Sequence, residues 1–413
     1  MLFKVAWHSL LNRRLTVGLT VLLISVSTVV LMGVEHIRNE ARNSFSKTVS
    51  GTDLIVGART GQINLLLYSI FHIGNASNNI SWQSYQEISA RPGVAWTVPI
   101  SLGDSHRGYR VVGTTAAYFE RFRYGNQQSL EFMHGREFSS LHEAVVGAEV
   151  AAALSYAEGD EIVLAHGLGR VSFSNHDDQP FIIVGVLAPT GTPVDRSVHV
   201  SLESLEAIHR NWPGGGFSPG VSRATPDFTP QSITAFLVGL ESRLATFTVQ
   251  RQINDYRQEP LLAILPGVAL SELWSMMGAL EQVLRLIALL VLAASLLGMS
   301  IMLLSTMAQR QREIAVMRAM GAHSSFIFFL VELEALLITL AGVVLGAVAL
   351  HLGLDLGADW LSARYGLFMD STLLNYRMLT FAGLILAGAA VLALLPAVVA
   401  YRGSLAQTLS SRS

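Results

Sequence analysis

Cysteine is absent from the sequence, which excludes disulfide bonds, a thiolate nucleophile and cysteine-bound zinc. Charged residues are scarce as well, at 14% of 413 residues, and the net charge is only −2. Because nothing in this balance gives a general basic footprint, we expect no nucleic-acid partner. Apolar residues make up 51% of the chain, which predicts an integral membrane protein.

Several chemical motifs are also missing. The sequence has no G-x-x-x-x-G-K-[ST] phosphate loop, so any nucleotide energy must come from another chain. It has neither a G-x-S-x-G nucleophile elbow nor an H-E-x-x-H zinc pair, which argues against a membrane hydrolase or protease. We therefore predict a chain that is not an enzyme and that holds no cofactor.

Long apolar runs are the most prominent feature that is present. A helix needs roughly 20 apolar residues to cross a bilayer, and the third such run carries two carboxylates, Glu332 and Glu334. No signal-peptidase-like site follows Gly33, so the first run predicts an uncleaved anchor. The four predicted spans are residues 15–33, 286–307, 326–352 and 379–400.

Basic residues beside these runs predict the orientation, because Lys and Arg are retained in the cytoplasm. They precede the first run, separate the second from the third and follow the fourth, which predicts that both termini are cytoplasmic and that residues 34–285 lie outside. The remaining segments are a cytoplasmic amphipathic helix at 1–14, an outer loop at 353–378 and a cytoplasmic tail at 401–413. The basic residues are Lys4, Arg13, Arg14, Arg310, Arg312, Arg318 and Arg402.

The outer segment predicts a large α+β domain. Its ends, 34–49 and 268–285, are expected to continue the first and second spans as helical stalks, and a helix is expected at 82–89 after the N-cap residue Ser81. Short β-rich runs lie between. They are Val94 to Ile100, Tyr109 to Val112, Ala144 to Val146, Glu161 to Ala165, Phe181 to Leu187, Val198 to Leu202 and Ile233 to Leu240.

Three patches of this domain leave alternatives open. Residues 63–74 are apolar but too short to span, so they form either a buried core helix or a segment at the membrane surface or a substrate entrance. Residues 209–231 are rich in Gly and Pro and carry Trp212, which indicates either a plain loop or a contact surface. Residues 176–178 (His-Asp-Asp) are either a solvated loop or ligands for a divalent metal.

Residues 309–323, between the second and third spans, predict a short amphipathic helix. Ile314, Met317 and Gly321 recur at helical spacing, with Val316 and Met320 as a neighbouring apolar row, and the charges lie largely off that face. Gly321 suits a helix C-cap. The helix either anchors the loop at the membrane surface or docks into a protein groove.

The pattern R-E-I-x-x-x-R-A-x-G-A over 312–322 resembles the cytoplasmic coupling segment of MacB/FtsX-type permeases. Other parts are similar to the family in the same order, although Val398 and Val399 stand where the terminal motif usually carries basic residues. These parts are Phe3 to Arg14, G-R-x-F at 135–138, V-x-G-x-x-x-A at 145–151, E-A-L-L at 334–337 with Gly342 and Gly346, and Pro396-Ala397.

The resemblance implies a permease subunit of a bacterial ABC transporter in the inner membrane. Expected partners are a cytoplasmic ABC ATPase dimer, a second permease copy forming a homodimer, membrane lipids and a periplasmic adaptor or substrate-binding protein. ATP hydrolysis on the ATPase would then drive export or extraction of a substrate by mechanotransmission. The alternative is an ATPase-linked signalling or scaffold protein that regulates an outer partner. The sequence does not say whether the cargo is a lipoprotein, a peptide, a toxin or a metal complex.

Particular residues follow from this reading. Gly342 and Gly346 allow close helix approach, either within one subunit or across a dimer. Glu332 and Glu334 face different directions on one helix and serve either a structural role at the base of the bundle or proton or cation transfer. The predicted ATPase interface consists of Arg310, Arg312, Glu313, Ile314, Met317, Arg318 and Gly321.

Overall fold

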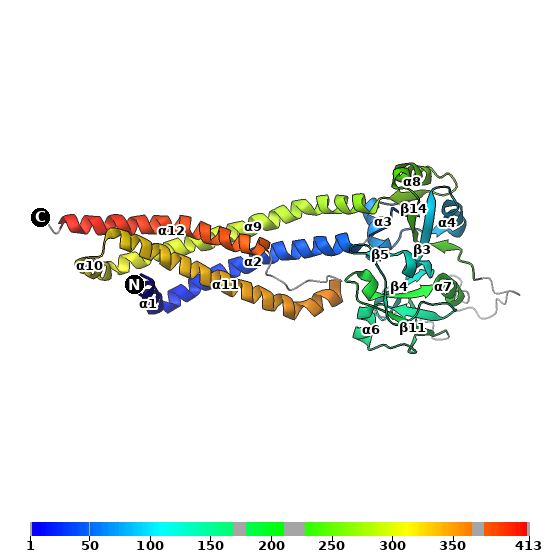
Figure 1. Ribbon diagram of the computed structural model, residues 1–413, viewed down its shortest axis with the longest axis horizontal. Helices are drawn as coiled ribbons and strands as arrows, with labels where there is room; N and C mark the ends of the chain where they lie inside the picture. The colour runs from blue at the N-terminus through cyan, green and yellow to red at the C-terminus, as the bar shows by residue number, and fades with distance from the viewer. Residues whose placement is uncertain (1, 49, 168–178, 210–227, 366–375, 411–413) are drawn as a thin grey trace. The chain divides into compact units, whose positions relative to one another are not determined.

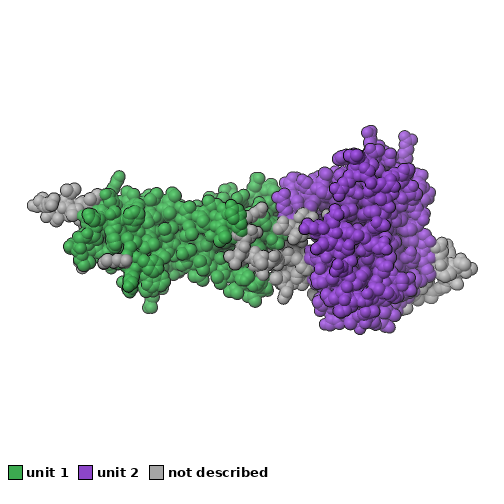
Figure 2. Space-filling model, viewed as in Figure 1, with its two compact units in different colours: residues 1–41, 278–365, 369–413 green, residues 42–277, 366–368 purple. Residues whose placement is uncertain are grey.

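The computed structural model describes residues 2–48, 50–167, 179–209, 228–365 and 376–410. These residues form two compact units (Figure 2). The helical unit comprises residues 1–41, 278–365 and 369–413, and the α/β unit comprises residues 42–277 and 366–368. Two of the open patches of the sequence, 176–178 and most of 209–231, lie outside the described residues.

Among the described residues, four helices are long and apolar enough to cross a membrane, which confirms the predicted number of spans. The apolar stretches run over Arg14–Glu40, Pro266–Met307, Ser324–Gly357 and Met378–Arg402. The helices of the first two spans, α2 and α9, extend beyond the apolar runs predicted at 15–33 and 286–307, as expected (Figure 1). The helices are α1 (Leu2–Asn12), α2 (Arg14–Thr48), α9 (Pro266–Gln309), α10 (Gln311–Ala319), α11 (Ser324–Tyr365) and α12 (Tyr376–Ser410).

Glycines let α11 approach α2 closely in the helical unit. A Cβ on Gly342 would lie 2.6 Å from Ile24, and one on Gly346 would lie 2.8 Å from the Ser25 carbonyl oxygen and from Thr28. The Ser25 hydroxyl donates a hydrogen bond of 3.0 Å to the Gly342 carbonyl across the same contact. Both glycines therefore pack helices within one subunit, as small residues do at close crossings in membranes.

Hydroxyl groups bind α9 to its neighbours in the same unit. Ser27 of α2 contacts the hydroxyl of Ser295, and Ser300 donates a 3.0 Å hydrogen bond to the Leu392 carbonyl of α12. These bonds join helices whose buried apolar residues form a single cluster. The polar bonds therefore fix which faces of the helices meet.

The α/β unit is built on a mixed sheet in the order β15-β1-β14-β3-β4-β12-β8-β11-β7, with β10 paired to β3 and β9 to β11. Strands are present in every predicted run, although the run at 161–165 is divided between β9 and β10 and the run at 233–240 between β13 and β14. The long strand β3 is shared by both halves of the sheet. The bounds are β1 Leu54–Ala58, β3 Val94–His106, β4 Tyr109–Thr114, β7 Phe132–Gly135, β8 Glu143–Val146, β9 Glu161–Ile162, β10 Ala165–His166, β11 Phe181–Leu187, β12 Ser197–Ser201, β14 Ala235–Leu240 and β15 Leu261–Ile264, with the small pairs β2 Ile80–Ser81 and β13 Ser232–Ile233, and β5 Arg123–Tyr124 and β6 Gln128–Ser129.

Short helices cover this sheet. In the apolar patch at 63–74, α3 buries Leu65, Leu66 and Tyr68 in the core, which confirms a buried helix there. The Ser81 side chain caps α4 by accepting from the Ser84 amide, as predicted. The helices are α3 Gln62–Ser69, α4 Trp82–Ser89, α5 Ala117–Arg121, α6 Ala148–Leu154, α7 Leu202–His209 and α8 Thr246–Asn254, with 3₁₀ turns at Pro193–Arg196 and Arg243–Ala245.

The glycines of two sequence signatures are required by the backbone. Gly135 has a φ of +75°, and a side chain there would collide with the Val184 carbonyl. A side chain on Gly147 would collide with the carbonyl oxygens of Val194 and Asp195. The motifs therefore record close backbone approaches at the ends of β7 and β8.

Candidate functional site

A buried ionic network lies where α1, α10 and α11 meet in the helical unit. The Glu334 carboxylate accepts from the Ser9 hydroxyl at 2.5 Å, from Arg310 at 3.0 Å and from Arg13 at 3.3 Å. Arg310 also donates from its Nε to Glu313 at 2.8 Å. We call these five residues the Glu334 network.

Burial makes the network electrostatically strong. The side chain of Glu334 is 0% exposed and that of Arg310 is 9% exposed, whereas that of Glu313 is 61% exposed. The two arginines balance the two carboxylates, so the cluster is neutral as a whole. Removing one charge would leave its partner unpaired in an apolar setting, and such a loss is strongly destabilising.

The network joins segments that are distant in the sequence. Ser9 belongs to α1, and Arg13 lies in the link between α1 and α2. Arg310 separates α9 from α10, where its φ of −96° and ψ of 13° interrupt the helix. Because Glu334 lies in α11, its carboxylate connects this helix to the end of α1 and to the junction of α9 and α10.

Backbone geometry ends α10 shortly after the network. Gly321 has a φ of +96°, and the Ala322 amide donates to the Met317 carbonyl at 3.0 Å. This left-handed glycine and the bond reaching back over it are typical of a helix C-cap. The predicted cap is therefore present, and α11 begins at Ser324 after a short turn.

The predicted interface residues divide into inward and outward groups. Arg310 turns into the network, and Ile314 is 8% exposed within the apolar cluster of the helical unit. Met317 packs against that cluster, and Arg318 donates to the Ser324 hydroxyl. Glu313 and Gly321 are exposed, and the Arg312 side chain lies outside the described part of the chain.

The neighbouring apolar row of the sequence pattern is exposed; it consists of Val316 in α10 and Met320, the residue that caps that helix. Val316 is 58% exposed and Met320 is 76% exposed. Their spacing of four residues places them on one face of the helix. Val316 and Met320 are therefore exposed, whereas Ile314 and Met317 pack against the apolar cluster of the helical unit.

The second carboxylate of α11 has a different environment. Glu332 is half-buried, and its Oε1 has no hydrogen-bond partner among the described residues. Glu334 lies two positions further along and is wholly paired. The two carboxylates therefore face different directions, and the geometry supports a structural role for Glu334.

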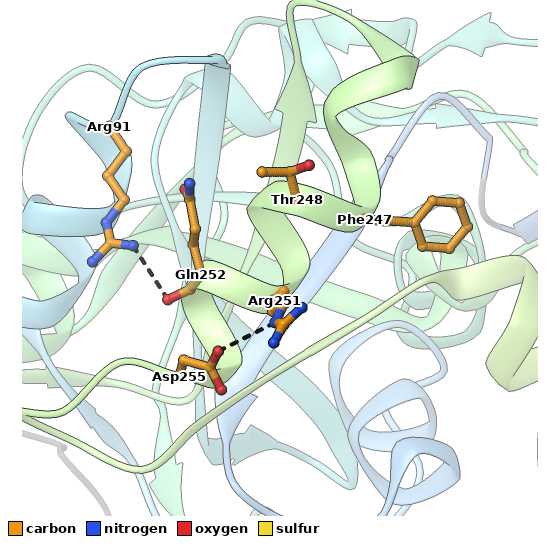
Figure 3. A pocket seen from close by; sticks show the side chains of 6 residues that line it. All are labelled: Arg91, Phe247, Thr248, Arg251, Gln252 and Asp255. Atoms are coloured by element: carbon orange, nitrogen blue, oxygen red, sulfur yellow. Dashed lines mark hydrogen bonds and ion pairs between the residues drawn. The ribbon is translucent and has the colours of Figure 1, made fainter.

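An open hollow of about 630 Å³ lies over α8 in the α/β unit. Figure 3 shows Arg91 donating to the Gln252 carbonyl, at 3.3 Å, and Arg251 facing Asp255 at 3.6 Å. The ion pair is largely exposed, since its side chains are 85% and 72% accessible. Solvent screens the charges of such an exposed pair, so we assign no chemistry to the hollow.

Buried histidines of the α/β unit have displaced acidities. Burial lowers the pKa of His72 to about 3, helped by His199 and Arg110, and burial lowers the pKa of His199 to about 4. His72 bonds to the Ser197 hydroxyl at 2.9 Å, and His199 lies among aromatic rings. The lowered pKa values favour neutral rings at both positions; His199 is fully buried, whereas His72 is half-buried.

Asp104 is a buried acid of this unit, 3% exposed, and its carboxylate contacts His166 and His209. Burial raises its pKa, but hydrogen bonds from His166 and His209 outweigh that effect and leave the pKa below its ordinary value. The pKa of His166 is raised mainly by its hydrogen bond to Asp104. This carboxylate is therefore an ionised acceptor.

Comparison with protein families decides the class of the chain. The model of the MacB-like periplasmic core domain matches residues 17–256, and that of the FtsX-like permease C-terminal region matches residues 285–406. The chain belongs to the MacB/FtsX-type permease family. It is accordingly a multi-pass membrane subunit of an ABC transporter, and permeases of this family work with ABC ATPase partners.

Solved structures include distant likenesses to this MacB/FtsX-type permease. The periplasmic region of MacB from Actinobacillus actinomycetemcomitans is 10% identical, with a TM-score of 0.34 over 55% of this chain and 94% of that chain. The extracellular domain of the noncanonical ABC-type transporter YknZ from Gram-positive bacteria is 13% identical, with a TM-score of 0.31 over 52% of this chain and 99% of that chain. Among curated proteins, no relative matches.

Sequence reasoning missed the role of Ser9, Arg13 and Arg310 as partners of Glu334. A signal was present, because an acid inside a membrane span requires a partner at the same depth. Arg13 and Arg310 both flank spans on the side where the third span begins. Pairing each intramembrane acid with the nearest flanking bases would have identified the two arginines.

Proposed function

We propose that this permease docks a cytoplasmic ABC ATPase through α10 and carries its motion to the outer α/β domain. The observation that supports this most directly is the Glu334 network, in which the partly exposed Glu313 is linked through Arg310 to a buried carboxylate. Displacement of α10 by a partner would disturb that linkage. The network would then pass the disturbance to α1 and α11.

The docking surface in this proposal is the outward row of α10. Val316 and Met320 supply apolar area, and Glu313 supplies a charge beside them. Full burial of such a side chain contributes about 1.5–3 kcal/mol. The sequence also predicts Ile314 and Met317 in the ATPase interface. Both pack against the apolar cluster of the helical unit, and in this proposal they hold α10 in place.

Transmission rests on helices that continue without a break. Both α2 and α9 extend well beyond a single apolar span, as single helices of 35 and 44 residues. A continuous helix transmits displacement along its axis better than a loop does. We assign export or extraction of a substrate by mechanotransmission to this arrangement.

The assembly and orientation complete the proposal. Both termini and α10 are cytoplasmic in the bacterial inner membrane, and the α/β unit is periplasmic. Two permease copies form a homodimer on an ATPase dimer, with a periplasmic adaptor or substrate-binding protein as a further partner. The basic residues that flank the spans support this orientation, and the family supports the ATPase partner.

The test separates docking from transmission. Met320→Asp should lower ATPase recovery in a pull-down, because it places a charge in the apolar contact. Glu313→Ala should leave the complex assembled but should weaken the coupling of ATPase turnover to transport. Both variants are compared with the parent in membranes with matched permease levels.

Leu244→Asp is the matched control, since Leu244 is 94% exposed in the α/β unit. It should leave ATPase recovery unchanged. Normal assembly and transport for both α10 variants would refute the docking and transmission roles. Assembly and ATPase turnover without any transported substrate would favour a signalling or scaffold protein instead.

A further inference from the structure

Three side chains from separate segments of the α/β unit converge on one point. Asp104 lies in β3, His166 in β10 and His209 at the end of α7. One ligand atom from each lies within 4.8 Å of the others. This cluster is separate from the Glu334 network and does not depend on the ATPase-docking proposal.

Strand pairing positions the first two ligands. His166 and Asp104 are direct cross-strand partners in the β10–β3 pair, and the His166 Nδ1 lies 2.8 Å from the Asp104 carboxylate. The Gly167 amide donates to the Gly103 carbonyl at 3.1 Å beside them. A register irregularity between Leu102 and Ser105 falls on the same stretch of β3.

A capped helix positions the third ligand. The Ser201 hydroxyl accepts from the Ser204 amide at 3.1 Å at the start of α7, and Leu205 fills the space over Gly113 of β4. These contacts fix the helix whose last residue is His209. The His209 Nε2 lies 3.1 Å from the other carboxylate oxygen of Asp104.

A hydrogen-bond network without metal is the simplest alternative. The distances of 2.8 and 3.1 Å suit two imidazole N–H groups donating to one carboxylate. The neighbouring His106 belongs to a hydrogen-bond network of another kind, since its two nitrogens contact the Val163 carbonyl and the Tyr156 hydroxyl. His106 has no carboxylate within that set, so its surroundings offer no metal site.

The geometry of the cluster also fits a metal. Ligand atoms of a tetrahedral zinc with bonds near 2.0–2.1 Å lie about 3.3 Å apart. The two imidazole nitrogens lie 2.8 and 3.1 Å from the Asp104 carboxylate, and all three ligand atoms lie within 4.8 Å of one another, so a modest rearrangement would reach that geometry. The imidazole rings stack with centroids 4.7 Å apart and planes 19° apart, directing both toward one acid. Asp104 is 3% exposed, whereas the histidine side chains are 33% and 37% exposed, which leaves a route from solvent.

We propose that Asp104, His166 and His209 bind a divalent zinc ion. Two imidazoles and a carboxylate suit zinc better than calcium or magnesium, which prefer sets of oxygen ligands. Three protein ligands leave one tetrahedral position for water or for a donor atom of another molecule.

The experiment measures zinc bound by the full-length permease, purified through a tag without histidine, stripped with chelator and dialysed against zinc. The parent should retain one zinc per chain. His166→Ala and His209→Ala should each weaken zinc binding by at least about tenfold, the lower end of the loss known for outer-shell partners. Cobalt in place of zinc should give the absorption of a tetrahedral site in the parent and lose it in both variants.

His134→Ala is the control, because it removes an exposed histidine from the same unit. It should bind zinc like the parent. Both ligand variants lie at partly exposed positions, and parent-like thermal unfolding without metal would show that they fold. Zinc retained by the His166→Ala/His209→Ala double variant would overturn the proposal. So would a loss of zinc binding that occurs only when residues 176–178 are replaced by alanine. A parent that holds no stoichiometric zinc would overturn it as well.

Discussion

Replacing Glu334 by Gln tests whether the buried network holds the helical unit together. The substitution keeps the side-chain volume and leaves one oxygen that can accept from the Ser9 hydroxyl. It removes the charge that faces Arg310 at 3.0 Å and Arg13 at 3.3 Å. Two cations would then share a site whose only remaining carboxylate, Glu313, is largely exposed.

The expected loss follows from burial. Breaking a buried ion pair by removing one partner costs about 3–5 kcal/mol, because the remaining charge stays desolvated. Glu334 is fully buried, so we expect the substitution to decrease the free energy of unfolding by about 3–5 kcal/mol. Adding Arg310→Gln to Glu334→Gln restores the charge balance. The double variant should therefore lose about 1–3 kcal/mol less stability than the two single variants lose in sum.

The assay is unfolding of purified permease in mixed micelles, followed by tryptophan fluorescence. Glu332→Gln is the matched control on the same helix, since Glu332 is half-buried and its Oε1 lacks a hydrogen-bond partner among the described residues. It should change stability by no more than about 0.5 kcal/mol. Equal effects at 332 and 334, or strict additivity with Arg310→Gln, would refute the reasoning.

Three further predictions concern packing, acidity and orientation. Gly346→Ala should destabilise the helical unit by about 1–3 kcal/mol in the same unfolding assay, because a Cβ there would lie 2.8 Å from α2, whereas Gly383→Ala, with open space, should not. Stability should fall as pH drops from about 6.5 toward 4, because the folded-state pKa of His199, about 4, lies below its unfolded value, and His199→Phe should flatten that fall in unfolding curves across pH. In this cysteine-free chain, Glu158→Cys should react with an impermeant maleimide in intact cells and Met320→Cys only after permeabilisation; the reverse pattern would contradict the proposed orientation.

Local features of the fold were predictable from the sequence. The apolar runs determine the spans because bilayer thickness sets a minimum length, and the cap at Ser81 follows from side-chain chemistry within three residues. Short β-rich runs located β3, β4, β8, β11, β12 and β14, but β1, β7 and β15 were not predicted. Their order in the sheet was not predictable, since β1 pairs with β14 and β15 from the far end of the domain.

The sites depend on contacts between distant segments, which periodicity does not report. The helical pattern placed Ile314 and Val316 on apolar rows, but it gave no indication that the first row packs into α10's own subunit while the second is exposed. The zinc ligands likewise meet only because β10 pairs with β3 and α7 ends nearby. The adjacent His-Asp-Asp at 176–178 was the more visible pattern, although neighbours in sequence rarely converge on one ion.

The Glu334 network combines burial with one exposed arm, and this combination bears on how a small displacement could be transmitted. A neutral cluster is stable only while both arginines remain in contact with Glu334, because separation leaves a desolvated charge. Glu313 holds Arg310 from the exposed side through a 2.8 Å bond. A partner that competes for the Glu313 carboxylate would therefore change the balance of forces on Arg310 without touching the buried residues. Since interfaces packed in this way shift between discrete arrangements rather than deform gradually, the junction of α1, α10 and α11 is where we expect ATPase closure to be converted into movement of whole helices.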